Sequence, residues 1–222
     1  MHDWNLESID GIWLLTMGAG ENRVGAAALE SWGSVLDRVE EDVEPGALVV
    51  TGEGKFWSTG LDLDEIRGYS NEARVGFMKR FEQILGRILT SPLVTVAALN
   101  GHTVAGGALL ALAHDYRIMR EDQGYFSLPS VDIGIPFTHG MSELISAKIP
   151  QPSAHDLVVS CRNVGGREAH ALGVVTATAN RSAVLPEAIA LASSLNDKDP
   201  ETLRTVKTRL YDKATTLLLS QP

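Results

Sequence analysis

Apolar positions along the chain follow two patterns: short continuous runs, and longer stretches with a helical period. The short runs predict strands covered on both faces, because every residue of such a strand can be apolar. They are residues 12–16, 47–51, 95–99, 116–119, 125–128 and 174–176. The periodic stretches predict amphipathic helices. They are residues 26–39, 71–89, 108 onward, 139–148 with Thr138 as cap, 153–160, 167–172, 186–195 and 201–219. Strands alternating with helices indicate an α/β fold with parallel crossovers.

The central stretch, residues 95–115, combines a buried strand with a small-residue bend at Ala105-Gly106-Gly107 and an apolar helix. Glycines ahead of a helix leave main-chain N–H groups unpaired and let a ligand approach closely. A helix N-terminus also favours negative charge. Gly106 and Gly107 alone would fit tight helix–strand packing. The chain has a second turn of this type at residues 58–62. Two such turns favour a different interpretation, a site where main-chain amides bind developing negative charge.

Composition and charge narrow the choice of partner. The 222-residue chain carries a formal charge of −9, which argues against nucleic acid or an anionic membrane as the main partner. Its apolar runs are too short to cross a bilayer. The single Cys161 allows no internal disulfide and fits a reducing compartment. With no secretory or peroxisomal signal visible, we expect a cytoplasmic protein.

Four segments give the chain a specific resemblance: GKFWSTGLDL (54–63), ALNGHTVAGGALLALAHD (98–115), VDIGIP (131–136) and REAHALGVV (167–175). In order and spacing they resemble the enoyl-CoA hydratase/isomerase (crotonase) superfamily, especially short Δ3,Δ2-enoyl-CoA isomerases of the plant peroxisomal type. The resemblance implies a spiral of ββα units over residues 1–175 and a C-terminal helical trimerisation region over 176–222. It also implies a homotrimer or hexamer, a role in fatty acid metabolism, and an acyl-CoA thioester substrate. Coenzyme A then enters as part of that substrate, with no separate cofactor.

The same resemblance assigns residues to the site. Enolate chemistry needs two convergent N–H donors at the thioester oxygen, and the resemblance places these at Leu61 and Gly106. It places Thr59 and Leu61 beside coenzyme A, and Arg23 near the nucleotide. Its 3′-phosphate would meet one of three cations of the last predicted helix, Lys207, Arg209 or Lys213.

The chain departs from the family pattern at the two positions where the family carries its catalytic acid and base. Hydratases of the family carry two glutamates, and the matching positions here are Leu109 and Ser130. Hydration needs a positioned acid and base, so we expect no hydratase activity, and an isomerase would need a replacement base. His139 and Glu143 lie four residues apart on a predicted helix that should border the acyl pocket, so they would share one face. The candidate catalytic residues are therefore Leu61, Gly106, Ser130, His139 and Glu143.

Three functions remain open. The leading one is isomerisation through an enolate. The second is other chemistry of the same fold, hydratase-like, decarboxylase or thioesterase. The third is acyl-CoA binding without catalysis. We interpret His102 and His114 as structural histidines and Cys161 as a packing residue, and we expect no metal site because no cluster of ligands has metal spacing.

Overall fold

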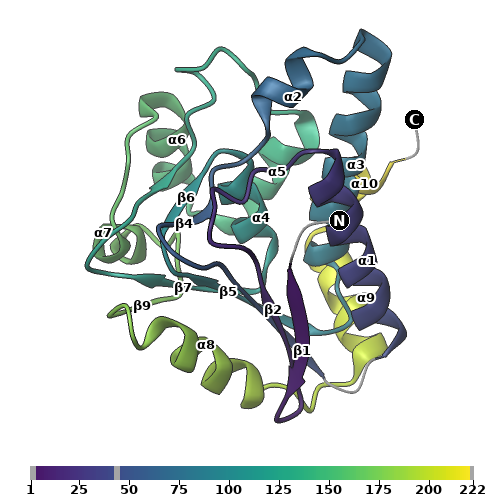
Figure 1. Cartoon of the computed structure of the whole chain (residues 1–222), viewed down its shortest axis with the longest axis vertical. Coiled ribbons are helices and arrows are strands. Elements are labelled where there is room, and N and C mark those ends of the chain that lie inside the picture. Colours follow the sequence, from purple (N-terminus) through teal and green to yellow (C-terminus); the bar gives the residue numbers. More distant parts are fainter. Residues whose placement is uncertain (1–3, 43–45, 221–222) are drawn as a thin grey trace.

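The computed structural model describes residues 4–42 and 46–220, which form two β-sheets surrounded by helices (Figure 1). The larger sheet has the order β1-β2-β3-β5-β7-β9, and the smaller has the order β4-β6-β8. β1 is antiparallel to β2, and the other neighbouring strands are parallel. The larger sheet comprises β1 (Asn5–Ile9), β2 (Ile12–Thr16), β3 (Ala47–Thr51), β5 (Val94–Leu99), β7 (Tyr116–Arg120) and β9 (Ala177–Ala179). The smaller comprises β4 (Phe56–Ser58), β6 (His102–Val104) and β8 (Phe126–Ser127).

Consecutive strands enter the two sheets in turn. β3, β5 and β7 join the larger sheet, and β4, β6 and β8, which follow them, join the smaller. Helical segments follow each pair, which confirms the predicted spiral of ββα units. The helices are α1 (Ala26–Glu41), α2 (Leu63–Arg67), α3 (Asn71–Leu89), α4 (Gly106–Ala113), α5 (His139–Lys148), α6 (Gln151–Ser160), α7 (Gly166–Ala171), α8 (Val184–Ser193), α9 (Pro200–Leu210) and α10 (Asp212–Leu219). In the described ranges, none of them is long and apolar enough to span a membrane.

The inner strands of the larger sheet, β2, β3, β5 and β7, are buried on both faces, whereas the edge strand β1 is largely exposed. All six residues of β5 are buried, as its continuous apolar run predicts. Leu99 belongs to the main core with Trp32 and Phe81, whereas Val96 packs in a second core with Ala188 of α8. Figure 1 shows α8 on one side of this sheet and α1 and α3 on the other. α4, which follows β6, packs against α3, α5, β4 and β6, so its position is fixed from several directions.

The chain beyond residue 175 contributes to the sheet itself. β9 pairs with β7, and α8 contacts β3, β5 and β7. α10 packs against α3 and α5. The predicted division at residue 175 therefore falls inside the larger sheet.

Two predicted elements differ from the structure. The strand predicted at residues 174–176 is wrong, because the amides of Val174 and Val175 bond back to Ala169 O at 2.8 and 3.3 Å and the strand begins at Ala177. The helix predicted at 201–219 is two helices that meet at Tyr211, whose ψ of 29° leaves the helical range. Local propensity favours one long helix there, and the packing of α10 on α3 and α5 overrides it.

Candidate active site

The first candidate donor lies in the turn between β4 and α2. Gly60 adopts φ +91°, a conformation that glycine tolerates without strain. Val24 bonds to both sides of Leu61: its N–H donates to Gly60 O at 2.7 Å, and its carbonyl accepts from Asp62 N at 3.0 Å. Asp62 then caps α2, because Oδ1 accepts from the amides of Asp64 and Glu65 at 3.2 Å. The Leu61 amide lies between these bonds and has no hydrogen-bond partner among the described residues.

The second candidate donor is the first residue of α4. Ala105, the N-cap, has φ +53° and ψ −119°, a strained conformation for a residue with a side chain. Its N–H donates to Ser127 O at 3.0 Å, and its carbonyl accepts from Leu109 N at 3.1 Å. The Gly106 amide starts the helix and has no partner in the part of the chain that the structure describes. Every residue of α4 is buried, so this amide is held rigidly.

The two donor turns contact each other through their main chains. A Cβ built on Gly60 would lie 2.6 Å from Gly106 N, and one built on Gly106 would lie 3.2 Å from Leu61 N. A Cβ on Gly107 would lie 2.5 Å from Ser58 O. The approaches at Gly60 and Gly107 leave no room for a side chain, the one at Gly106 is tight, and together they bring the Leu61 and Gly106 amides close to each other. Such a pair can stabilise an oxyanion, with each donor typically contributing about 3–4 kcal/mol.

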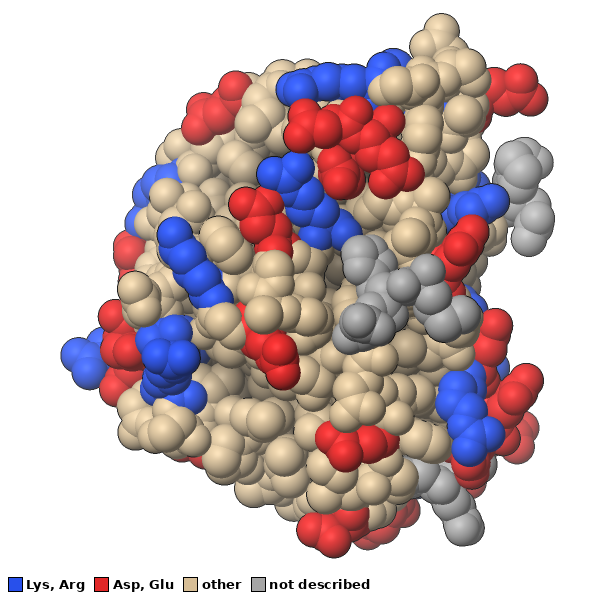
Figure 2. Space-filling view, in the orientation of Figure 1, with Lys and Arg blue, Asp and Glu red and all other residues tan. Residues whose placement is uncertain are grey.

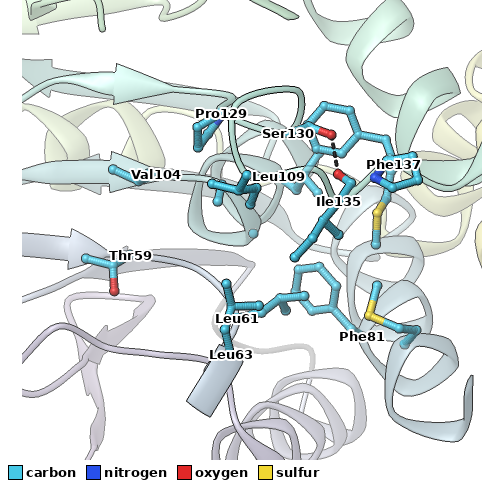
Figure 3. Close-up of a pocket in the computed structure, with 16 residues that line it drawn as sticks. Thr59, Leu61, Leu63, Phe81, Val104, Leu109, Pro129, Ser130, Ile135 and Phe137 are labelled. Atoms are coloured by element: carbon cyan, nitrogen blue, oxygen red, sulfur yellow. Dashed lines mark hydrogen bonds between the residues drawn. The ribbon is translucent and has the colours of Figure 1, made fainter. Parts of the chain in front are cut away.

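Both donor residues line an apolar cavity of about 210 Å³, whose walls Figure 3 shows. Its remaining wall comes from α2, α3, α4 and the segment from Pro129 to Met141. The lining residues are Thr59, Leu61, Leu63, Met78, Phe81, Val104, Ala105, Gly106, Leu109, Pro129, Ser130, Ile133, Ile135, Pro136, Phe137 and Met141. None of them is ionisable, and their hydroxyl groups come from Thr59 and Ser130. The sequence places Met78 and Phe81 on an apolar helix face, but no pattern separates a face bordering a cavity from a packed one.

Ser130 and Leu109 both lie in the cavity wall. The Ser130 hydroxyl donates to the carbonyl of Ile135, as the dashed line in Figure 3 shows, and the Ile135 amide donates to Ser130 O at 3.1 Å. This pair of bonds closes the loop that forms one side of the cavity. The Ser130 hydroxyl is therefore already used as a donor. The Leu109 side chain is apolar and has no group that could transfer a proton.

The structure does not bring His139 and Glu143 to this cavity. His139 is the first residue of α5, and Glu143 follows one turn later. Thr138 caps this helix as predicted, because its Oγ1 accepts a hydrogen bond from Met141 N at 3.2 Å. Met141 is the α5 residue that faces the cavity, while His139 is exposed and Glu143 lines a separate hollow against α10. The expectation that their shared face borders the acyl pocket is therefore wrong.

Arg23 lies on the far side of the first donor turn, whereas Thr59 lines the cavity. Arg23 lines a hollow of about 520 Å³ beside the cavity and is 43% exposed. Its guanidinium contacts Glu21 at 2.5 Å and Asp64 at 3.2 Å, and these carboxylates raise its pKa. Thr59 donates its hydroxyl to Glu21 O at 3.3 Å. Figure 2 shows acidic side chains beside basic ones over α2, so a nucleotide phosphate would meet mixed charge there.

Lys207, one of the three cations suggested for the 3′-phosphate, occupies a structural position instead. Its Nζ donates to Ser91 O at 3.1 Å and Leu93 O at 2.8 Å, and pairs with Asp115 at 2.6 Å. The side chain is 6% exposed, and burial lowers its pKa while Asp115 opposes that shift. Lys207 thus ties α9 to the start of β5.

Further buried polar groups lie behind α4, close to Asp115. Burial lowers the pKa of His114 to about 4, and its Nδ1 lies 2.8 Å from Leu110 O. This confirms a structural histidine. The pKa of Lys148 is lowered to about 7, mainly by burial and secondly by the nearby positive charge of Arg117. Arg117 donates Nε to Val174 O at 2.8 Å. None of these groups lines the cavity.

Comparisons with known proteins agree on one family. A family model described as enoyl-CoA hydratase/isomerase matches residues 9–221. The chain is 36% identical over 220 residues to enoyl-CoA delta isomerase 3 of Arabidopsis thaliana, covering 93% of this chain and 91% of that one. The structure resembles human mitochondrial delta3-delta2-enoyl-CoA isomerase with a TM-score of 0.92 at 22% identity, over 98% of this chain and 86% of that one. It also resembles an enoyl-CoA hydratase from Mycobacterium ulcerans with a TM-score of 0.90 at 20% identity, over 97% and 94%.

Proposed function

Because this chain belongs to the enoyl-CoA hydratase/isomerase family, we propose that it binds an acyl-CoA thioester and acts as an enoyl-CoA isomerase. The single observation that carries the proposal is the pair of unpaired amides, Leu61 and Gly106, at the wall of an apolar cavity. A thioester carbonyl oxygen placed between them would receive two hydrogen bonds. The apolar cavity would take the acyl chain and exclude water, which strengthens both bonds.

The reaction that fits this arrangement moves a double bond by way of the enolate. Loss of a proton from C2 of a 3-enoyl thioester places negative charge on the oxygen, where the two amides stabilise it. Return of the proton at C4 leaves the double bond between C2 and C3. Side-chain identity matters little for a main-chain donor, so Leu61 can serve. Hydration fits less well, because it needs an acid and a base on a water molecule and Leu109 and Ser130 provide neither.

Incubation of the protein with 3-enoyl-CoA in deuterated buffer tests the proposal. Isomerase activity gives 2-enoyl-CoA, and deuterium appears at C2 or C4 to the extent that the transferred proton exchanges with solvent. A hydroxyacyl product instead identifies a hydratase. Tight binding without either product contradicts isomerisation and leaves acyl-CoA binding as the function.

A second candidate, decarboxylation, is favoured by the absence of ionisable residues from the described cavity wall. A 2-carboxyacyl thioester forms the same enolate without a base. The bond from C2 to the carboxylate breaks and CO₂ leaves, while the electron pair of that bond stays on C2 and delocalises to the thioester oxygen. Water then protonates C2. Desolvation of the carboxylate by apolar walls favours this loss of charge. Release of CO₂ from malonyl-CoA, without turnover of 3-enoyl-CoA, would select this function over isomerisation.

We also propose that the protein works in fatty acid metabolism in the cytoplasm as a homotrimer or hexamer. Exposed apolar side chains on the C-terminal helices are consistent with assembly, with Val206 53% and Leu210 69% exposed. Light scattering in solution tests the assembly, and imaging of a tagged chain tests the compartment.

A further inference from the structure

One carboxylate lies on the helix that forms a wall of the cavity. Glu82 is on α3, directly after Phe81 and one helical turn after Met78, and both of these line the cavity. Residues four apart lie on one helix face, so Glu82 continues the stripe that Met78 begins. It is a half-buried acid in an otherwise apolar stripe that includes the buried Leu85.

The carboxylate is held in place by the start of α5. Thr138 Oγ1 lies 2.5 Å from Oε1 of Glu82 and donates to it, while the same hydroxyl oxygen accepts from Met141 N. Phe137 and Met141, on either side of Thr138, line the cavity. Gly140 leaves room for the carboxylate, because a Cβ there would lie 3.2 Å from Oε1. Glu82 is therefore oriented immediately behind the cavity wall.

The Glu82 carboxylate can accept further hydrogen bonds. Among the described residues its hydrogen bond is the one from Thr138, and it forms no ion pair. The nearby Lys79 donates to Ser220 at 3.0 Å. Oε2 is thus free to accept a proton, unlike the carboxylate of Asp115, which Lys207 and Thr95 occupy.

Met78 separates Glu82 from the cavity. Met78 lines the cavity and also a neighbouring hollow of about 340 Å³, which Glu82 and Thr138 line as well. A methionine side chain has three rotatable bonds and adapts readily to its surroundings. Because Glu82 does not line the cavity itself, a reaction of Oε2 with an acyl chain there requires Met78 to rotate so that the two spaces join.

We propose that Glu82 is the catalytic proton carrier of the enolate reaction, an inference that rests on the proposed function. The bond between C2 and its hydrogen breaks, and the proton binds Glu82 while the electron pair delocalises to the thioester oxygen at Leu61 and Gly106. The carboxyl group then gives the proton to C4, and the C2–C3 double bond forms as the enolate collapses. Glu82 leaves the cycle as a carboxylate.

The Glu82→Gln variant tests this role, because the amide keeps an oxygen for Thr138 and cannot act as a base. We expect kcat for 3-enoyl-CoA to fall by about 10²–10⁴, the usual contribution of a general base, with unchanged binding of saturated acyl-CoA by calorimetry. The matched control is Glu72→Gln on the exposed first turn of α3, which should retain full activity. Glu82→Asp, which keeps a carboxylate, should retain more activity than Glu82→Gln.

A second readout separates this inference from the proposed function. Exchange of the C2 hydrogens of saturated acyl-CoA with deuterated solvent reports proton abstraction without isomerisation. If the wild-type protein exchanges but does not isomerise, and Glu82→Gln abolishes exchange, the isomerase proposal fails and the role of Glu82 stands. Normal kcat and exchange in Glu82→Gln would overturn it. A wild-type protein that binds without either reaction would overturn both proposals.

Discussion

The main-chain nitrogen of Gly106 lies 2.6 Å from the position that a Cβ on Gly60 would occupy. No side chain fits at residue 60 unless the two donor turns move apart. Gly60 also has φ +91°, which adds strain for any other residue. This single approach couples the stability of the turns to the geometry of the site.

Gly60→Ala should therefore lower both stability and turnover. We expect a loss of about 1–3 kcal/mol in the free energy of unfolding, from overpacking and strain. Turnover should fall by about 100-fold or more, the usual effect of losing one hydrogen-bond donor to the oxyanion. Denaturant unfolding and the 3-enoyl-CoA assay measure the two effects. Gly33→Ala in α1, where a Cβ would meet nothing within 4 Å, is the control and should be neutral or slightly stabilising.

Ser130→Glu should raise isomerase activity by introducing a carboxylate into the cavity wall. A base in direct contact with substrate typically contributes about 10²–10⁴-fold. The variant loses the hydroxyl bond to Ile135, so stability should fall by about 1 kcal/mol. Ser130→Gln is the control, because it has the same size and cannot accept a proton as a base. Equal rates for the folded Glu and Gln variants would show that residue 130 does not reach the reacting carbons.

His114 should make the fold sensitive to acid. Its pKa is about 4 in the folded protein and about 6.5 in the unfolded chain, so the unfolded chain binds more protons between these values. Its contribution to stability is present above about pH 6.5 and is lost as pH falls towards 4, by about 3 kcal/mol in total. Unfolding measured across this range should show a shallower pH slope for His114→Phe than for wild type. His155→Gln on the exposed surface of α6 should leave the slope unchanged.

Lys207→Met should destabilise the protein without affecting affinity for coenzyme A. The substitution leaves Asp115 without its buried cation, a change that typically costs about 3–5 kcal/mol. Adding Asp115→Asn removes the stranded charge and should restore part of the stability, as a double-mutant cycle would measure. Arg209→Ala, on the exposed side of the same helix, is the control for stability. Weaker binding of coenzyme A by a folded Lys207→Met protein would contradict the structural role.

Leu210→Glu should disrupt assembly if α9 forms the subunit interface. Leu210 is 69% exposed, so a charge there should not affect folding of one chain but would oppose an apolar contact with another. Light scattering should show a smaller species than wild type. Val75→Glu on α3, also 69% exposed, provides the matched control. A wild-type protein that is monomeric at assay concentrations would contradict the trimer.

The parts of the structure that the sequence predicts correctly are those with strong local signals. Glycines at 60, 106 and 107 mark the two donor turns, because close main-chain approach leaves no room for a side chain at 60 and 107 and little at 106. Thr138 marks the start of α5 because its hydroxyl caps the first turn. By contrast, β4 and β6 have three residues each and leave too short a pattern to recognise.

Other features depend on how elements are oriented, which periodicity does not specify. The helix bearing His139 and Glu143 is predicted correctly, but the face that it turns to the cavity carries Met141. The apolar run at 174–175 fills the core from a turn and not from a strand. Glu82 did leave a signal, a lone carboxylate on the apolar stripe between Met78 and Leu85, but its meaning depends on Thr138 arriving from α5.

The two candidate donors of this site are main-chain atoms, which has a consequence for how the protein can change. The Leu61 side chain forms part of the cavity wall, while its amide has no partner among the described residues and would serve the proposed reaction independently of that side chain. Substitutions at residue 61 can therefore reshape the space for the acyl chain and leave the oxyanion site intact. If the proposed function holds, the side chain of residue 61 sets the shape of the acyl site while its main chain contributes to the chemistry, so selection or engineering could alter the first without the second.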